Sequence, residues 1–390
     1  MAKKKINIGL IGTGFMGRAH SLAWLNVSRV FDTDFDPVLK VCFSRNPDLT
    51  REFTEKWGWE TVTDDWRTII ERDDIDVIDI SAPTFMHSEI AVAAAEAGKH
   101  IFCEKPAAVT YAQAKAMAEA AEKAGVVHYL NHNYRRVPAV TYAKHLIDDG
   151  RIGDIFHWRG TYLQDWVVDP NFPLTWHFKK ELAGGGPLYD LNSHSVDLAR
   201  YLVGEIDAVT AVQKTFVTER PLPGKRAATF TSGDEVSEEK GPVDIDDASF
   251  IIAEFERGTL GSFNSTRFAT GRKNCNELEI YGNKGSLRWN FERMNELEFF
   301  DATRPAAEQG FKTISVTTGN HPYAGNWWGP GHIIGYENTF FHAAVDFLNA
   351  ISDGGVLTPN LNDGVACIRV LEAAIKSSEE KRRVAVAEIK

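Results

Sequence analysis

Short apolar runs alternate with amphipathic stretches along the first third of the chain. The runs predict strands at residues 6–11, 37–43, 75–81, 100–103 and 126–131. The stretches between them predict helices at 18–26, 50–57, 66–72, 87–97 and 110–124. Strands that alternate with helices form a parallel sheet covered on both faces. We therefore expect an α/β fold whose residues 1–137 form a doubly wound, dinucleotide-binding Rossmann domain.

Beyond about residue 154, apolar positions recur at every second residue instead. This alternation predicts strands, joined by short turns and so mainly antiparallel, at 155–163, 208–217, 248–257, 259–266, 276–281, 286–291 and 296–300. Helices expected at 186–202 and 336–352 would cover one face of the sheet, and a helix at 363–381 and a strand at 383–389 would follow. The polar segment 219–247 is too long for an ordinary connection and is expected to be an excursion. Residues 138–390 should thus form an α+β domain for substrate binding and oligomerisation, with a large, mainly antiparallel sheet and a C-terminal segment able to pack back on the first domain.

Composition narrows the possible partners. The 390 residues carry 43 Lys and Arg against 54 Asp and Glu, a net charge of −11, which argues against binding to nucleic acid or to an anionic membrane surface. No stretch approaches the roughly 20 apolar residues of a membrane helix. The four cysteines form no C-x-x-C pair and the 12 histidines no compact ligand set, so we expect no metal and a cytoplasmic protein.

A glycine motif follows the first predicted strand and opens a helix. In Gly12-Thr13-Gly14-Phe15-Met16-Gly17 the spacing is G-x-G-x-x-G. Gly12 permits a tight turn, Gly14 lets the backbone approach a pyrophosphate, and Gly17 lets the helix pack on the strand. The N–H groups at the start of the helix favour phosphate. The motif therefore predicts a dinucleotide site, with a glycine-rich turn without a ligand as the alternative.

The end of the second predicted strand bears on which dinucleotide binds. An acidic residue there would accept the ribose hydroxyls of NAD, and none is present in Ser44-Arg45-Asn46. Arg45 can pair with the 2′-phosphate of NADP or stack on adenine, or it can be a solvated loop arginine. NAD and NADP therefore both stay open as cofactors.

Three further residues suit the removal of a hydride and a proton from an alcohol. Lys105 directly follows a strand in Glu104-Lys105-Pro106, where its ammonium can stabilise a developing alkoxide. Asp190 and His194 lie four residues apart, on one face of a predicted helix, where the imidazole can act as the base. By themselves such a lysine and such a pair are more often solvated surface groups.

Taken in order, these motifs resemble the Gfo/Idh/MocA family of oxidoreductases. The resemblance also rests on Asn133-Tyr134-Arg135-Arg136, on Gly184-Gly185-Gly186 and on Gly282-Asn283-Lys284-Gly285, and it covers essentially the whole chain. It implies an NAD(P)-dependent dehydrogenase, active as a homodimer or homotetramer, with catalytic Lys105, Asp190 and His194. The cofactor-binding residues it implies are Gly12, Gly14, Phe15, Met16, Gly17, Ser44, Arg45, Ala82, Pro83, Thr84, His87, Glu104, Lys105, Asn133 and Trp176. The substrate-binding residues it implies are Lys105, Tyr134, Gln164, Trp166, Asp190 and His194.

Within the family the chain is most similar to the members that oxidise levoglucosan. This likeness is carried by 133–139, 160–166, 199–205, 241–247 and 321–323, and it implies oxidation of the C3 hydroxyl of levoglucosan or a related pyranoside to the 3-keto sugar. Trp166 suits such a substrate because indole rings pack against sugar C–H faces, although core or interface packing is the commoner role of such rings. His177 stands where arginine is expected, which bears on the exact substrate. The alternatives are an inositol dehydrogenase and an NAD(P)-responsive binding protein of the same fold.

Overall fold

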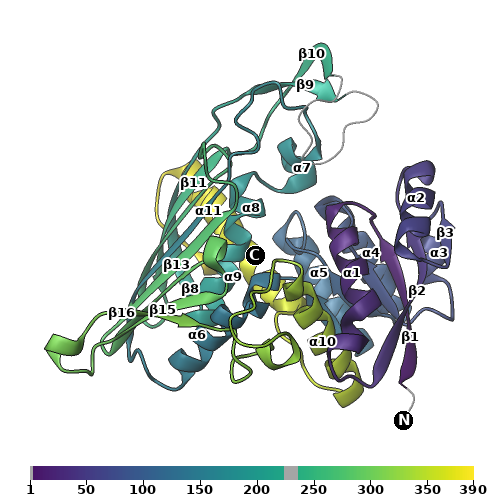
Figure 1. Cartoon of the computed structure of the whole chain (residues 1–390). Coiled ribbons are helices and arrows are strands. Elements are labelled where there is room, and N and C mark those ends of the chain that lie inside the picture. The colour runs from purple at the N-terminus through teal and green to yellow at the C-terminus, as the bar shows by residue number, and fades with distance from the viewer. Residues whose placement is uncertain (1–2, 224–235) are drawn as a thin grey trace. The chain divides into compact units, whose positions relative to one another are not determined.

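The computed structural model describes residues 3–223 and 236–390, which belong to two compact units. The first comprises Met1–Arg136 with Gly335–Ala366, and the second comprises Val137–Ile334 with Cys367–Lys390 (Figure 1). No helix in the described ranges is long and apolar enough to cross a membrane. Each unit is built around its own sheet, and each is described separately below.

The first unit contains a parallel sheet with the strand order β3-β2-β1-β4-β5-β6. The strands are β1 (Lys4–Ile11), β2 (Phe35–Phe43), β3 (Thr61–Thr63), β4 (Val77–Ile80), β5 (His100–Cys103) and β6 (His128–Leu130). Strand β4 is buried along its whole length, including the one polar residue in it, Asp79. The order reverses between β1 and β4, and ligands of such sheets bind at the carboxyl ends beside this point. The predicted Rossmann sheet is confirmed.

Helices α1 (Phe15–Val30), α2 (Pro47–Trp57), α3 (Arg67–Ile70), α4 (Thr84–Glu96) and α5 (Tyr111–Ala124) connect these strands. A helix from late in the chain, α10 (Asn338–Asp353), also belongs to this unit and packs against α1 (Figure 1). The ring of Phe347 lies 6.2 Å from Trp24 and 5.3 Å from Phe102. The expectation that this helix covers the second sheet is therefore wrong, because its apolar face is buried in the first unit.

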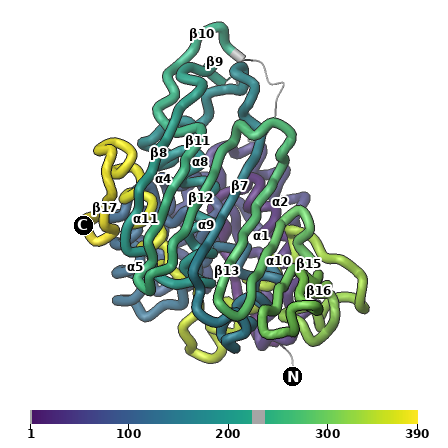
Figure 2. The backbone as a smooth tube through the Cα atoms, turned by 90° about the vertical axis from the view of Figure 1, so that its left-hand side faces the viewer, coloured from purple at the N-terminus to yellow at the C-terminus, as the bar shows by residue number. Residues whose placement is uncertain are grey.

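The second unit contains a mixed, mostly antiparallel sheet with the order β16-β15-β14-β13-β7-β12-β11-β8-β17, and Figure 2 shows its central strands side by side. Its strands are β7 (Ile155–Leu163), β8 (Ile206–Lys214), β11 (Ala248–Phe255), β12 (Leu260–Thr266), β13 (Cys275–Gly282), β14 (Gly285–Asn290), β15 (Glu296–Asp301), β16 (Phe311–Ser315) and β17 (Val384–Ala385). Strands β7 and β12 pair in parallel, whereas the other neighbours are antiparallel. The predicted fold class is thereby confirmed.

Helix α9 (Asn192–Leu202) packs on β7 and β12, and the other helices assigned wholly or mainly to this unit are α6 (Pro138–Asp148), α7 (Lys180–Ala183), α8 (Pro187–Asp190) and α11 (Leu361–Glu380). The predicted helix 186–202 is interrupted at Leu191, so Asp190 ends one helix and His194 lies in the first turn of the next. Short 3₁₀ turns occur at Asn133–Arg136, Trp176–Phe178, Phe291–Arg293, Ala306–Glu308, Ala324–Asn326 and Val386–Glu388.

The structure adds detail to two predictions for the second unit. The polar excursion 219–247 contains an antiparallel pair, β9 (Glu219–Pro223) and β10 (Val236–Pro242), although residues 224–235 lie outside the described ranges. The predicted strand 383–389 pairs with β8 only over Val384–Ala385 before a 3₁₀ turn begins.

Candidate active site

The glycine loop between β1 and α1 has the geometry that a dinucleotide needs. Gly12 has φ +114°, and a Cβ there would lie 2.4 Å from the Ser81 carbonyl, so only glycine fits. A Cβ on Gly17 would lie 2.2 Å from the Gly12 oxygen, which fixes the helix close to the strand. Beside Gly14, in contrast, a Cβ would meet no atom within 4 Å. The open space beside Gly14 and the uncapped N-terminus of α1 therefore fit a pyrophosphate.

Other predicted cofactor residues lie at the carboxyl ends of the same sheet. Phe15 and Met16 form the first turn of α1, where the Phe15 ring stacks 6.2 Å from Tyr336. Ala82 and Pro83 follow β4, and Thr84 begins α4. Ser44 and Arg45 directly follow β2, and the Arg45 side chain is exposed. These residues thus share the edge at which a dinucleotide would bind.

His87 joins two of the loops at this edge. It is buried, with Nε2 2.8 Å from the Ala82 carbonyl oxygen and Nδ1 3.0 Å from that of Pro106. Burial lowers the pKa of His87 below its ordinary value, despite these carbonyls. A neutral imidazole carries one N–H and donates to one carbonyl at a time. Because both nitrogens face the protein backbone, His87 contributes to the site by holding the loops around Lys105 and Thr84.

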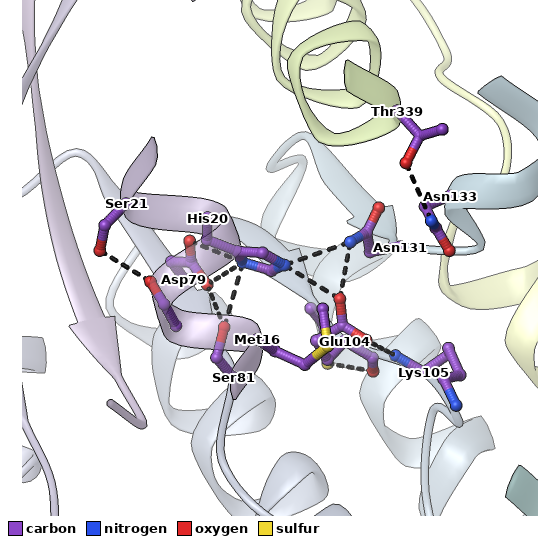
Figure 3. Close-up of polar contacts among 12 residues, drawn as sticks. Met16, His20, Ser21, Asp79, Ser81, Glu104, Lys105, Asn131, Asn133 and Thr339 are labelled. Carbon is purple, nitrogen blue, oxygen red and sulfur yellow. Dashed lines mark hydrogen bonds and ion pairs between the residues drawn. The ribbon is translucent and has the colours of Figure 1, made fainter. Parts of the chain in front are cut away.

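A buried polar cluster lies beside the Glu104-Lys105-Pro106 loop (Figure 3). His20 contacts Asp79 Oδ1 at 2.8 Å and Glu104 Oε1 at 2.9 Å. The Glu104 carboxylate also accepts hydrogen bonds from Asn131 Nδ2, at 2.6 Å, and from the Lys105 backbone N–H, at 3.2 Å. Sequence reasoning missed His20 and Asp79, although an aspartate inside an apolar strand requires a buried partner and was a usable signal.

The 3₁₀ turn after β6 holds two more predicted residues. Asn133 is buried and donates from Nδ2 to Thr339 Oγ1 of α10 at 2.9 Å. The Tyr134 ring lies 6.5 Å from Tyr336. The segment that begins at Gly335 therefore anchors the end of the Rossmann sheet, which periodicity alone could not reveal.

In the second unit, predicted substrate residues form one connected group. Trp166 Nε1 donates to Gln164 Oε1 at 2.8 Å, and Gln164 Nε2 donates to Asn274 Oδ1 at 2.8 Å. The same oxygen accepts the Tyr162 hydroxyl at 2.8 Å, and the Tyr162 ring lies 5.8 Å from the His194 ring. The structure thus connects the indole and amide expected to bind a sugar to the imidazole expected to act as base.

Arg267 connects Asp190 to the same group and was not anticipated from the sequence. Its side chain is buried, and Nη1 lies 3.7 Å from Asp190 Oδ2. The guanidinium lies 5.2 Å from the centre of the Trp166 ring and 5.6 Å from that of Phe178. The guanidinium thus places a positive charge beside the Asp190 carboxylate. Only the approach of β12 to α8 in the fold reveals this pairing.

The predicted cofactor residue Trp176 lies in the second unit and stacks on His177, with ring centres 3.9 Å apart. His177 is the residue that stands where the resemblance leads one to expect arginine. The His177 ring also meets the edge of the Trp166 ring at 5.9 Å. His177 therefore borders the group that contains the predicted substrate residues. In the described ranges, no group of three or more His, Cys, Asp or Glu side chains is arranged to hold a metal ion.

Comparison with known proteins places both units in one family. The model of an oxidoreductase family with an NAD-binding Rossmann fold, GFO/IDH/MocA, matches residues 6–132. The model of the GFO/IDH/MocA C-terminal domain matches residues 140–288.

Individual relatives match over nearly the full length. A levoglucosan dehydrogenase of Pseudarthrobacter phenanthrenivorans is 45% identical over 388 residues, covering 99% of each chain. A myo-inositol 2-dehydrogenase of Thermotoga maritima is 27% identical, covering 98% of this chain and 99% of its own. A solved levoglucosan dehydrogenase in complex with NADH and levoglucosan superposes with a TM-score of 0.92 at 44% identity, covering 98% of this chain and 99% of that one.

Proposed function

The chain belongs to the Gfo/Idh/MocA oxidoreductase family, and on that premise we propose that it is an NAD-dependent sugar dehydrogenase. The most specific form of the proposal is oxidation of the C3 hydroxyl of levoglucosan, or of a related pyranoside, to the 3-keto sugar. The observation that carries it is the group of Gln164, Trp166, Asp190 and His194 in the second unit. It occurs in a chain 45% identical, over nearly its whole length, to a levoglucosan dehydrogenase.

Oxidation of a secondary alcohol breaks a C–H and an O–H bond. NAD, when bound, accepts the hydride from carbon. We assign to His194 the acceptance of the hydroxyl proton, with Asp190 orienting the substrate or the imidazole. We assign to Lys105 an ammonium that stabilises the negative charge developing on the oxygen. The glycine loop at Gly12 and Gly14 would hold the pyrophosphate and so fix the nicotinamide end.

The residues of the second unit suit a sugar substrate for a separate reason. An indole such as that of Trp166 packs against the C–H face of a pyranoside, while Gln164 and Asp190 supply polar atoms for hydroxyls. The His177 ring touches the edge of that indole, so this departure from the family pattern bears on which sugar fits.

Steady-state NADH formation over a panel of levoglucosan, methyl glucosides and inositols tests the proposal. We expect the highest kcat/KM with levoglucosan or another pyranoside. A preference for an inositol would instead establish the cyclitol alternative. Absence of turnover with every polyol, in protein that binds NADH, would favour a binding protein and overturn the dehydrogenase.

A substitution at Arg45 tests whether this residue contributes to binding of NADP in preference to NAD. Its side chain is exposed directly after β2, with no acidic residue in 44–46 to repel a 2′-phosphate. We expect Arg45→Ala to lower kcat/KM for NADP about 10-fold or more, the worth of a charge-assisted hydrogen bond, and to change that for NAD less than about 3-fold. Arg51→Ala, which removes an exposed arginine of α2 paired with Asp48, is the matched control. An equal change in kcat/KM for NAD and for NADP would show that Arg45 does not bind the 2′-phosphate.

We also propose that the enzyme is a homo-oligomer, a dimer or a tetramer. On strands β8, β11 and β12, the large apolar side chains of Val212, Phe250, Ile252 and Leu260 are all exposed. Phe250 lies opposite Val212, and Ile252 follows two positions later on β11, so these three exposed side chains lie on one face of the sheet. Monomeric proteins seldom expose such an apolar face, which suits a second copy of the chain.

Light scattering with a single charge substitution tests this surface. Ile252→Glu places a carboxylate on this face at a side chain that is 63% exposed, and we expect it to yield folded protein with fewer subunits than wild type. Leu49→Glu on α2, at a side chain that is 57% exposed, should leave the assembly unchanged. A wild-type monomer, or an Ile252→Glu variant with the wild-type number of subunits, would show that this face is not an interface.

A further inference from the structure

His20 lies in α1, just past the glycine loop, and its ring is completely buried within the first unit. Nδ1 faces Asp79 of β4 at 2.8 Å, and Nε2 faces Glu104, directly after β5, at 2.9 Å (Figure 3). Each ring nitrogen therefore contacts a different carboxylate, and the two carboxylates come from neighbouring strands. A neutral imidazole could donate to only one of them, so two carboxylates at hydrogen-bond distance favour the imidazolium.

The groups around the His20 ring favour its protonated, positively charged form. Burial alone would lower the pKa of His20, but the charge and hydrogen bond of Asp79, followed by those of Glu104, outweigh it and raise the pKa to about 10. Burial would likewise raise the pKa of Glu104, yet the hydrogen bond and charge of His20 lower it. The other faces of the ring meet Phe102, at 5.2 Å, and Phe340 of α10, at 5.5 Å. Asn131 completes the enclosure with its side-chain amide.

The two oxygens of Glu104 connect this cation to the loop of Lys105. Oε1 accepts from His20 and from Asn131, whereas Oε2 accepts the backbone N–H of Lys105 at 3.2 Å. The Glu104 carboxylate therefore bridges the buried His20 ring and the backbone N–H of Lys105. Asp79 is held from its other sides by Trp24 Nε1, at 2.6 Å, and by Ser81 Oγ, at 3.0 Å.

We propose that His20 is a positioning residue for Lys105, fixing the Glu104 carboxylate and thereby the backbone from which the Lys105 ammonium reaches the substrate. The inference rests on the proposed function, since that function gives Lys105 its role. Without the imidazolium, Asp79 and Glu104 would be two buried carboxylates with no cation bonded to both, and one would take up a proton and turn. Misplacement of a catalytic group by about 1 Å can cost roughly 100-fold in rate.

The full-length His20→Gln variant tests the proposal through the separation of kcat from KM. We expect kcat on the best sugar of the panel to fall about 10- to 100-fold, with KM for NAD within about twofold of wild type. Trp24→Phe is the matched control: it removes a donor to Asp79 in the same buried cluster but keeps the contact of His20 with Glu104 and the hydrogen bond between Glu104 and the Lys105 N–H. It should lower the melting temperature yet keep kcat within about twofold.

Stability against pH provides a second readout of the same bridge. Because the folded pKa of His20 lies above the ordinary 6.5, its stabilisation is complete below about pH 6.5 and is lost as the pH rises through about 10. Denaturant unfolding should therefore show wild type losing more stability than His20→Gln between pH 7 and pH 10. Parallel curves would show that His20 is not charged in the folded protein and would overturn the proposal.

The kinetic outcomes separate this proposal from the proposed function. The positioning role is overturned if His20→Gln keeps the wild-type kcat, or if Trp24→Phe loses as much kcat as His20→Gln does. The proposed function still stands in either case if Lys105→Met is inactive. If Lys105→Met has wild-type turnover, both the positioning role of His20 and the role of Lys105 in the proposed function are overturned. If His20→Gln does not fold, Asn131→Leu, which removes the second side-chain donor to Glu104 Oε1, replaces it, with an expected kcat loss of about 3- to 10-fold. An unchanged kcat in that variant also overturns the proposal.

Discussion

Replacing Lys105 with Met is expected to lower kcat about 100- to 1,000-fold while NADH binding persists. This is the usual cost of removing one preorganised group that stabilises an oxyanion. Methionine keeps the length and the apolar stem of the side chain, so the loss would report the missing charge. The measurement is steady-state NADH formation at saturating sugar, with NADH binding followed by fluorescence.

The matched control for Lys105 is Lys115→Met, which removes an exposed lysine of α5 paired with Glu119. We expect this variant to retain wild-type kcat, because an exposed ion pair of this kind contributes little to stability and this lysine was not assigned to the active site. A Lys105→Met variant with kcat within about threefold of the control would contradict the role assigned to the ammonium.

Replacing His194 with Gln is expected to lower kcat about 100- to 10,000-fold, the range found for loss of a general base. Glutamine retains a polar side chain of similar reach but cannot take up the proton. The remaining activity should rise towards alkaline pH, because hydroxide can accept the proton in place of the imidazole. The pH profile of kcat for both proteins measures this directly.

His145→Gln, at an exposed histidine of α6, is the control for the loss of any imidazole. It should match wild type at every pH. If His194→Gln retains the wild-type rate and profile, the proton leaves by another route, and the assignment of the base is wrong.

The Rossmann half of the fold could be predicted because its signals are local. Glycines with the required spacing follow β1, and the observed φ of Gly12 and the tight approach of Gly17 to Gly12 explain why those positions need glycine. The strand β4 is apolar because both faces are covered. Alternation in the second half likewise marked a half-covered sheet, which is the sheet observed.

What escaped prediction depends on contacts between distant segments. Helix α10 has a clear apolar face, but periodicity cannot say that this face packs on Trp24 and Phe102 instead of on the second sheet. The interruption at Leu191 separates Asp190 from the helix of His194, and helical spacing alone hides it. The paired strands β9 and β10 lie in a polar segment without a strong apolar alternation.

The polar partners within the site were equally hidden. Asp79 reads as an interruption of an apolar strand and His20 as one polar residue of a helix, yet the fold places them 2.8 Å apart. Arg267 lies 77 positions after Asp190 in the chain, and only the sheet brings their side chains to 3.7 Å. Residue types that suit a reaction were therefore recognisable, whereas the groups that hold them in place were not.

The most direct test of the central claim is transfer of label from a sugar that carries deuterium at C3. Levoglucosan with deuterium at that carbon and NAD would be turned over by the wild-type enzyme, and the reduced cofactor analysed by mass spectrometry and NMR. The account predicts one deuterium in each reduced nicotinamide, together with a 3-keto product. Reduced cofactor without deuterium, or no reduction of NAD by levoglucosan or any other pyranoside, would contradict it.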